Sequence, residues 1–323
     1  MKRDYPLLLA VWVLLGLLIL GITTWHPTHA TSPDSAHYLR MAADWRTYDG
    51  TFPPGYSLLI WLVSAITSLP GLWVSKLVNW LTLGYFGWAW ASRVGAKRAV
   101  WLLAIWLLPG NLRIVTYTWS ETVFIVLLLE AVWGMHRFSG EKTSSNALRV
   151  SGLLVALFWI RYVGLFVAII PRMRASGHIV KRTLIGIASL LILNIFLTGH
   201  LFGGPRLLLT EPWPELLNMA GIASLNELLL YDYRPERSLE IVGLAMLGQF
   251  LIVGVMGWLG WQKKGWQLAT FTQKPLVRLL FGVGTTYFLT LFALRFISPF
   301  DPLNERLMAP GSSCWLVALA LSV

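Results

Sequence analysis

The stretch PLLLAVWVLLGLLILGITT, residues 6–24, decides what kind of fold this chain adopts. It carries no charge, and a helix of this length reaches about 28 Å, close to the ~30 Å hydrocarbon core of a bilayer. It follows Met1-Lys2-Arg3, and Thr28-His29-Ala30 resembles a signal-peptide cleavage site. Because the run exceeds the ~7–15 residues of a signal core, a membrane-spanning helix is favoured over a cleaved signal peptide.

The rest of the chain is similarly apolar. Of 323 residues, 56% are hydrophobic and 13% are charged, against roughly 25% charged in soluble domains. This composition excludes a water-soluble enzyme, and the single cysteine excludes an intrachain disulfide. Further apolar runs cover residues 72–91, 99–117, 122–138, 150–171, 183–198, 241–261, 276–294 and 309–323. We expect an all-α polytopic membrane protein with one transmembrane domain over residues 1–323, about ten membrane segments and an incomplete last helix.

Two ambiguous segments decide the side on which later loops lie. Residues 55–69 are too short to span easily, since they reach about 22 Å as a helix, and the run 150–171 is interrupted by Arg161. If the first lies at the outer interface and the second is a broken hairpin, one side receives 16 of the 26 Lys and Arg residues and two of the 15 acids. Basic residues in short loops mark the cytoplasmic side.

The net charge of +11 is therefore a signal of membrane topology, and it argues against nucleic-acid binding. The N-terminus is expected in the cytoplasm of a prokaryotic cell, with the chain spanning the plasma membrane several times. Two large outer loops are expected at 25–71 and 199–240, with Lys76 among the outer bases. Because the inner loops offer mainly basic and small residues, we expect an active site on the outer face.

The first outer loop contains TSPDSAHYLRMAADWRTYDGTFPPGYSLLIWLVSAI, residues 31–66. Ser32-Pro33 is a typical helix start, and apolar residues at helical spacing then predict a helix lying flat on the interface. Asp34 falls in its first turn. It could simply satisfy free backbone N–H groups there, or it could accept a proton from an attacking hydroxyl. The two roles are compatible, whereas Asp44 and Asp49 are expected to be solvated.

The first outer loop resembles that of a known enzyme class in the order of its parts. It has the motif Asp34-Ser-x-x-Tyr38, then an interfacial helix, and then Phe-Pro-Pro-Gly-Tyr at 52–56. That class is the GT-C class of polyprenyl-phosphate-sugar glycosyltransferases, which includes the protein O-mannosyltransferases and lipid A aminoarabinose transferases. Four later segments also resemble the family. Residues 117–121 resemble its second outer turn, and residues 158–164 resemble its broken-hairpin turn. Residues 199–206 resemble its Gly-rich exit, and residues 299–310 resemble its late Arg-x-x-x-Pro turn.

The resemblance implies a GT-C-like helix bundle that takes a sugar from a polyprenyl phosphate in the membrane lipid. The acceptor would be a hydroxyl of a glycan, a lipid or a protein, with inversion at the sugar carbon. Asp34 would be the general base, and Glu121 would orient the reacting groups. The substrate-binding residues would be His37, Tyr38, Tyr56, Arg161, Arg206 and Arg306, the arginines facing the phosphate.

Several alternatives remain open for these residues. Arg161 could bond the free carbonyls of its hairpin, while Arg206 or Arg306 could pair with Glu211 or Glu305. The outer aromatic residues could be interfacial anchors, and His37 could have a packing role.

No cofactor is expected with certainty. A divalent metal is possible but not favoured, because Ser35 stands where many relatives carry a second acid. The plausible ligand set would be Asp34, Glu121 and His37, fewer oxygens than such a cation prefers.

Two other readings compete with a transferase. An inactive or truncated GT-C-like subunit would share these motifs. A transporter or flippase of lipid-linked glycans would need polar residues at the midplane and paired broken helices, but Glu130 is the one clear mid-span acid in the sequence.

Overall fold

The computed structural model describes residues 4–167, 177–201, 212, 214–215, 218, 274–297 and 304–322. All regular elements among them are helices, which confirms the all-α prediction. They are α1 (Tyr5–Trp25), α2 (Pro33–Ala43), η2 (Trp45–Thr47), α3 (Gly55–Thr67), α4 (Gly71–Val94), α5 (Ala96–Ala104), η3 (Ile105–Leu107), α6 (Pro109–Thr116), α7 (Glu121–Gly140), α8 (Ser144–Ile160), α9 (Gly164–Val167), α10 (Gly177–Thr198), α14 (Pro275–Ile297) and α15 (Glu305–Ser322). The expected span 241–261 and most of the 199–240 loop, including Arg206, lie outside the described residues.

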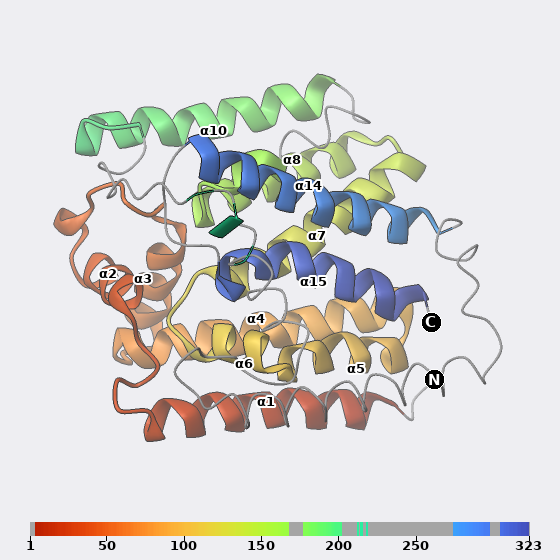
Figure 1. Cartoon of the computed structure of the whole chain (residues 1–323), viewed down its shortest axis with the longest axis horizontal. Coiled ribbons are helices and arrows are strands. Elements are labelled where there is room, and N and C mark those ends of the chain that lie inside the picture. Colours follow the sequence, from red (N-terminus) through yellow and green to blue (C-terminus); the bar gives the residue numbers. More distant parts are fainter. Residues whose placement is uncertain are drawn as a thin grey trace.

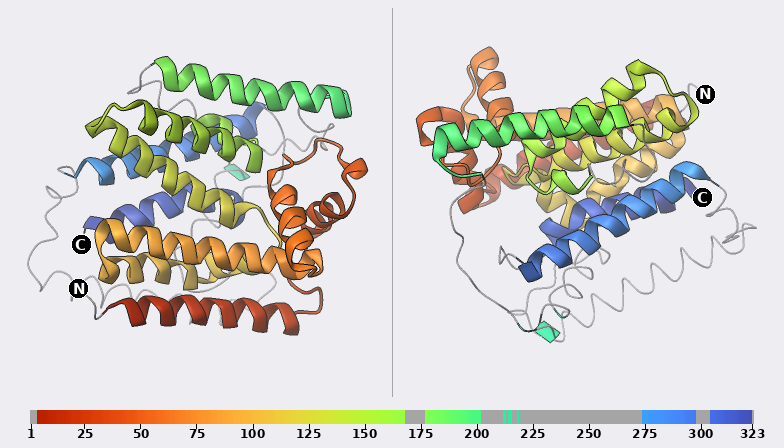
Figure 2. Two further views of the ribbon diagram at one scale, coloured as in Figure 1. Left: turned by 180° about the vertical axis from the view of Figure 1, so that it is seen from behind. Right: turned by 90° about the horizontal axis from the view of Figure 1, so that it is seen from above.

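The long helices run side by side, with both marked chain ends at one end of the bundle and α2 and α3 at the other (Figure 1). We call the end formed by α2, α3 and the first turns of α7 and α15 the loop end. Helix α4 starts directly after α3, and its 24 residues carry the chain about 36 Å to the opposite end. Helices α14 and α15 pack on each other and on α7, and they lie on one side of the other long helices in Figure 2.

Four described helices, α1, α7, α10 and α14, are long and apolar enough to cross a membrane. The number is six if each of two bent helix pairs, α3 with α4 and α5 with α6, counts as one span. The architecture is therefore compatible with an integral multi-pass membrane protein. The remaining segments of the expected ten include the run 241–261, which lies outside the described residues.

The first bend separates α3 from α4 by 105°. Ser68 ends α3 in the left-handed region, at φ 58°, and Pro70 precedes the first residue of α4. The chain therefore turns sharply instead of continuing one helix. This bend agrees with the prediction that residues 55–69 form an element distinct from the span that follows.

The second bend lies within the apolar run 99–117. Helices α5 and α6, joined through η3, meet at an angle of 78°. Leu108 is extended, with ψ 138°, and Pro109 begins a new helix. Proline supplies no N–H and disfavours helical backbone at the residue before it, so the helix ends there.

The expected break within 150–171 lies at Arg161. Helix α8 ends at Ile160, Arg161 is extended at φ −150° and ψ 134°, and α9 begins at Gly164. A Cβ atom on Gly164 would lie 2.5 Å from the carbonyl carbon of Leu157. The tight turn therefore requires glycine, and it leaves Arg161 at the tip of the turn. The rest of the run, from residue 168, lies outside the described part of the chain.

Helix α1 docks on α4 through a reciprocal pair of tryptophans. The Trp12 and Trp80 rings stack with centroids 4.2 Å apart, and each indole N–H donates to the other residue's backbone carbonyl at 3.0 Å. Each ring lies over a glycine of the opposite helix, where a Cβ would approach Trp80 to 2.6 Å at Gly16 and Trp12 to 2.8 Å at Gly84. Close approach of backbones across small residues is typical of helices packed in membranes.

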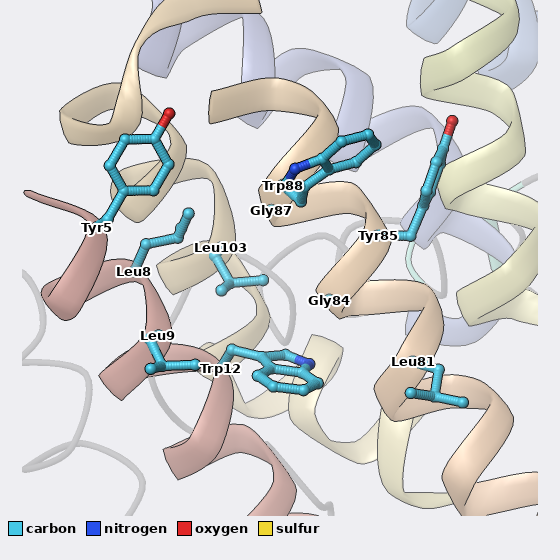
Figure 3. A pocket seen from close by; sticks show the side chains of 10 residues that line it. All are labelled: Tyr5, Leu8, Leu9, Trp12, Leu81, Gly84, Tyr85, Gly87, Trp88 and Leu103. Carbon is cyan, nitrogen blue, oxygen red and sulfur yellow. The ribbon is translucent and has the colours of Figure 1, made fainter. Parts of the chain in front are cut away.

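Beside this contact lies an apolar groove of about 330 Å³ (Figure 3). It is lined by Tyr5, Leu8, Leu9, Trp12, Leu81, Gly84, Tyr85, Gly87, Trp88 and Leu103. The groove includes the first turns of α1, and the 21 residues of α1 then carry the chain toward α2, which places the groove toward the end of the bundle opposite the loop end. Because its lining offers no carboxylate and no cationic group, it is not the candidate active site.

Candidate active site

Asp34 is placed by the first turn of α2. As predicted, α2 starts at Ser32-Pro33: the Ser32 hydroxyl accepts from the Ser35 N–H at 3.3 Å. The Trp119 indole N–H also donates to the Ser32 hydroxyl, at 2.7 Å. The start of α2 is therefore tied to the segment that leads into α7.

Glu121 is placed by the first turn of α7. Its side chain is only 2% exposed, and the positive end of the helix dipole favours a carboxylate at this position. The residue before it, Ser120, shares a hydrogen bond of 2.9 Å with the Tyr38 hydroxyl. Helices α2 and α7 are thus joined a second time, beside the two acids.

Two arginines from other parts of the chain meet these acids. Arg306, in the first turn of α15, pairs with Asp34 and lies with its Nε 3.1 Å from Glu121 Oε1. Arg161, at the broken turn after α8, pairs with the same carboxylate of Glu121. We call Asp34, Glu121, Arg161 and Arg306 the charge cluster. It joins four separate elements, and one of its contacts spans 272 residues of sequence.

Exposure differs within the charge cluster. The Asp34 side chain is 23% exposed, while those of Glu121, Arg161 and Arg306 are 2%, 15% and 11% exposed. The cluster is therefore reached from solvent most easily at Asp34. Trp119 covers one side, with its ring centroid 5.0 Å from the Arg306 guanidinium carbon.

The electrostatics of the charge cluster are balanced, with two carboxylates facing two guanidinium groups. Burial lowers the pKa of Arg161, but Glu121, Tyr287 and Tyr38 together outweigh burial and raise the pKa overall, so Arg161 stays charged. Arginine presents planar donors that match the oxygens of carboxylates and phosphates equally well. An entering phosphate could therefore exchange places with a carboxylate of the cluster.

No protein-family model, curated protein or solved structure matches this chain. The resemblance to the GT-C class therefore rests on the ordered sequence motifs. The charge cluster brings together one residue from each of four of these five motifs, namely Asp34, Glu121, Arg161 and Arg306.

His37 lies apart from the charge cluster. Its Nε2 is 3.3 Å from Asp49 Oδ1, and its ring contacts Phe52 edge-on, with centroids 5.1 Å apart. The three residues considered for a metal, Asp34, Glu121 and His37, are therefore not grouped, since Arg306 contacts both acids while His37 lies beside Asp49. Within the part of the chain that the structure describes, no three His, Cys, Asp or Glu residues are grouped so that they could hold a metal ion.

Tyr38 and Tyr56 lie beneath the charge cluster. Both are buried, and their rings meet edge to face with centroids 5.2 Å apart. The Tyr56 hydroxyl donates to Asn79 Oδ1 at 3.2 Å. Burial, with a contribution from Glu121, raises the pKa of Tyr38, so its hydroxyl stays protonated. In this arrangement the tyrosines support the floor of the site, and direct contact with a sugar stays a prediction.

The structure adds Lys76 to the site, a residue expected from the sequence only as one of the outer bases. Lys76, near the start of α4, is 4% exposed. Its ammonium donates to the Ala30 carbonyl at 3.1 Å and to the Thr118 hydroxyl at 3.0 Å. Among the described residues, no carboxylate lies within ion-pair distance of it. Its spacing from Asn79, three residues on in an otherwise apolar run, is the signal that could have indicated a buried polar face.

Proposed function

We propose that this chain is a membrane glycosyltransferase of the GT-C type. It transfers a sugar from a polyprenyl-phosphate donor to a hydroxyl of a glycan, lipid or protein acceptor. The observation that carries the proposal is the charge cluster, in which two acids and two arginines from distant segments meet at one end of an apolar bundle. Ionisable residues near membrane depth are costly and are usually kept for function.

The arginines account for recognition of the donor. A polyprenyl chain would lie among the helices and the lipid, with its phosphate at the loop end. Arg306 and Arg161 would bind that phosphate through charge-assisted hydrogen bonds and stabilise the charge that develops as the lipid phosphate leaves. Arg206, outside the described residues, stays a third candidate.

Asp34 accounts for activation of the acceptor. The acceptor oxygen bonds to the sugar's anomeric carbon while its proton passes to Asp34. At the same time the bond from that carbon to the phosphate oxygen breaks, and both electrons leave with the lipid phosphate. A single displacement of this kind inverts the sugar carbon. In the structure the Asp34 carboxylate is occupied by its ion pair with Arg306. Donor phosphate would compete for Arg306 and release the carboxylate when it is needed.

The site would lie on the outer face of the membrane. The connections between α4 and α5 and between α7 and α8, together with the helix ends beside them, carry Arg93, Lys97, Arg98, Arg137, Lys142 and Arg149. The lengths of α4 and α7 place these loops at the end of the bundle away from the charge cluster. This separation supports a cytoplasmic N-terminus and an outward-facing cluster.

The proposal is tested with the purified chain in liposomes that contain a panel of polyprenyl-phosphate sugars, with glycans, lipids and peptides as acceptors. Mass spectrometry follows free polyprenyl phosphate and glycosylated acceptor. We expect both products to rise together in at least one donor and acceptor pair. Movement of intact donor between leaflets without release of lipid phosphate would support a flippase instead. Neither product with any pair would favour an inactive subunit.

A further inference from the structure

We propose that Lys76 is a positioning residue that holds Asp34 and Glu121 in one site. It does so by binding the two chain segments that precede these acids and fixing both to α4. The effect on catalysis rests on the proposed function, but the effect on local order does not.

The contacts of Lys76 fall just upstream of both acids. Ala30, whose carbonyl accepts from the ammonium at 3.1 Å, lies four residues before Asp34. Thr118, whose hydroxyl accepts at 3.0 Å, lies three residues before Glu121. The neighbouring Ser75 hydroxyl also bonds the Thr118 hydroxyl, at 2.8 Å. One turn of α4 thus holds both segments.

The segment before Asp34 needs such a restraint. His29 and Ala30 have φ values of 50° and 49°, in the left-handed region that residues other than glycine seldom adopt. Backbone of this kind persists only where surrounding contacts over-determine it. Ala30 is fully buried, and its carbonyl is the group that Lys76 binds. Loss of the ammonium would let this turn relax and α2 shift.

Direct links between α2 and the segment before α7 already exist, at Trp119 with Ser32 and at Tyr38 with Ser120. Those links join the two segments to each other. Lys76 joins both to the bundle, so its loss would move the acids relative to the arginines on α15 and at the α8 turn. A misplacement of about 1 Å can cost on the order of 10²-fold in rate.

The first test is hydrogen exchange measured by mass spectrometry on the full chain in nanodiscs, comparing wild type, Lys76→Met and Lys97→Met. Lys97 is exposed at the opposite end of the bundle, which makes it a matched control. We expect exchange in peptides covering 26–38 and 116–121 to become several-fold faster in K76M alone. Unchanged exchange there would overturn the proposal, and so would a uniform increase across all helices, which reports general destabilisation.

Thr118→Val provides a second variant if K76M does not fold. It removes one acceptor and leaves the Lys76 side chain in place, so we expect the same two segments to loosen by a smaller factor. Unchanged exchange in T118V at 116–121 would likewise overturn the proposal.

The second test is sugar transfer. If Lys76 has a positioning role, K76M lowers kcat about 10²-fold with little change in KM for the donor. In a double variant with Asp34→Asn, K76M then causes little further loss of kcat. A rise in donor KM at unchanged kcat would assign Lys76 to phosphate binding and overturn the positioning role. If wild type transfers no sugar, the proposed function fails, while the exchange measurement still decides whether Lys76 orders the two segments.

Discussion

Replacing Asp34 with Asn should lower the rate of sugar transfer by about 10²–10⁴-fold, the usual contribution of a general base. Asparagine keeps the shape of the side chain and suits the first turn of α2, but it cannot take the acceptor's proton. Donor binding should persist or strengthen, because the D34N side chain no longer competes with the lipid phosphate for Arg306. Initial rates and donor KM in liposomes measure the two effects separately.

Asp44→Asn is the matched control for this prediction. Asp44 lies in the same loop, is exposed, and accepts from the Arg46 N–H at 3.0 Å to start η2. Asparagine caps a helix about as well as aspartate, so D44N should transfer sugar at the wild-type rate. Equal rates for D34N and wild type would eliminate Asp34 as the base and leave it only the structural role at the helix start.

The second large effect concerns stability. Glu130→Ala should destabilise the fold by about 3–5 kcal/mol, the cost of breaking a buried ion pair. Glu130, in the middle of α7, is 1% exposed. It accepts from Arg93 at 2.5 and 2.6 Å, from the Tyr85 hydroxyl at 3.1 Å and from Arg149 at 3.3 Å. Removing the carboxylate would leave Arg93 charged and without its carboxylate partner between α4, α7 and α8.

Glu141→Ala is the control for Glu130. Glu141 is exposed and lies 3.7 Å from Arg137 one turn before it, a surface pair worth about 0–1 kcal/mol. Unfolding in detergent, followed by thermal or denaturant titration, should separate the two variants clearly. Equal stability of E130A and wild type would contradict the account. It would also reopen a transport role for Glu130, since a mid-span acid that does not stabilise the fold needs another explanation.

Features governed by local rules could be predicted from the sequence. The start of α2 at Ser32-Pro33 follows from capping chemistry, and the break at Arg161 follows from a charge within an apolar run. Asp34 could be proposed because it stands in the first turn of a predicted helix, whereas Glu121 could be proposed only because its segment resembles the second outer turn of the GT-C class. Pro109 carries the same kind of local signal, since α6 begins at this proline.

Features that depend on long-range packing could not be predicted. The resemblance implied that Asp34 and Arg306 belong to one site, but it did not indicate that they form a direct ion pair across 272 residues, or that Arg161 and Arg306 share Glu121. The burial of Lys76 was also hidden, because a lysine near a helix end is as readily expected to extend toward water. Its contacts depend on where the α1–α2 and α6–α7 connections cross α4.

The most direct measurement of the central claim is a cryo-EM structure of the full chain in a nanodisc with added polyprenyl phosphate. We expect phosphate density within hydrogen-bond distance of both Arg306 and Arg161, with the Asp34 carboxylate released from Arg306 and facing the same space. Lipid phosphate bound only at the opposite end of the bundle, with the pair between Asp34 and Arg306 intact, would rule out the charge cluster as the donor site.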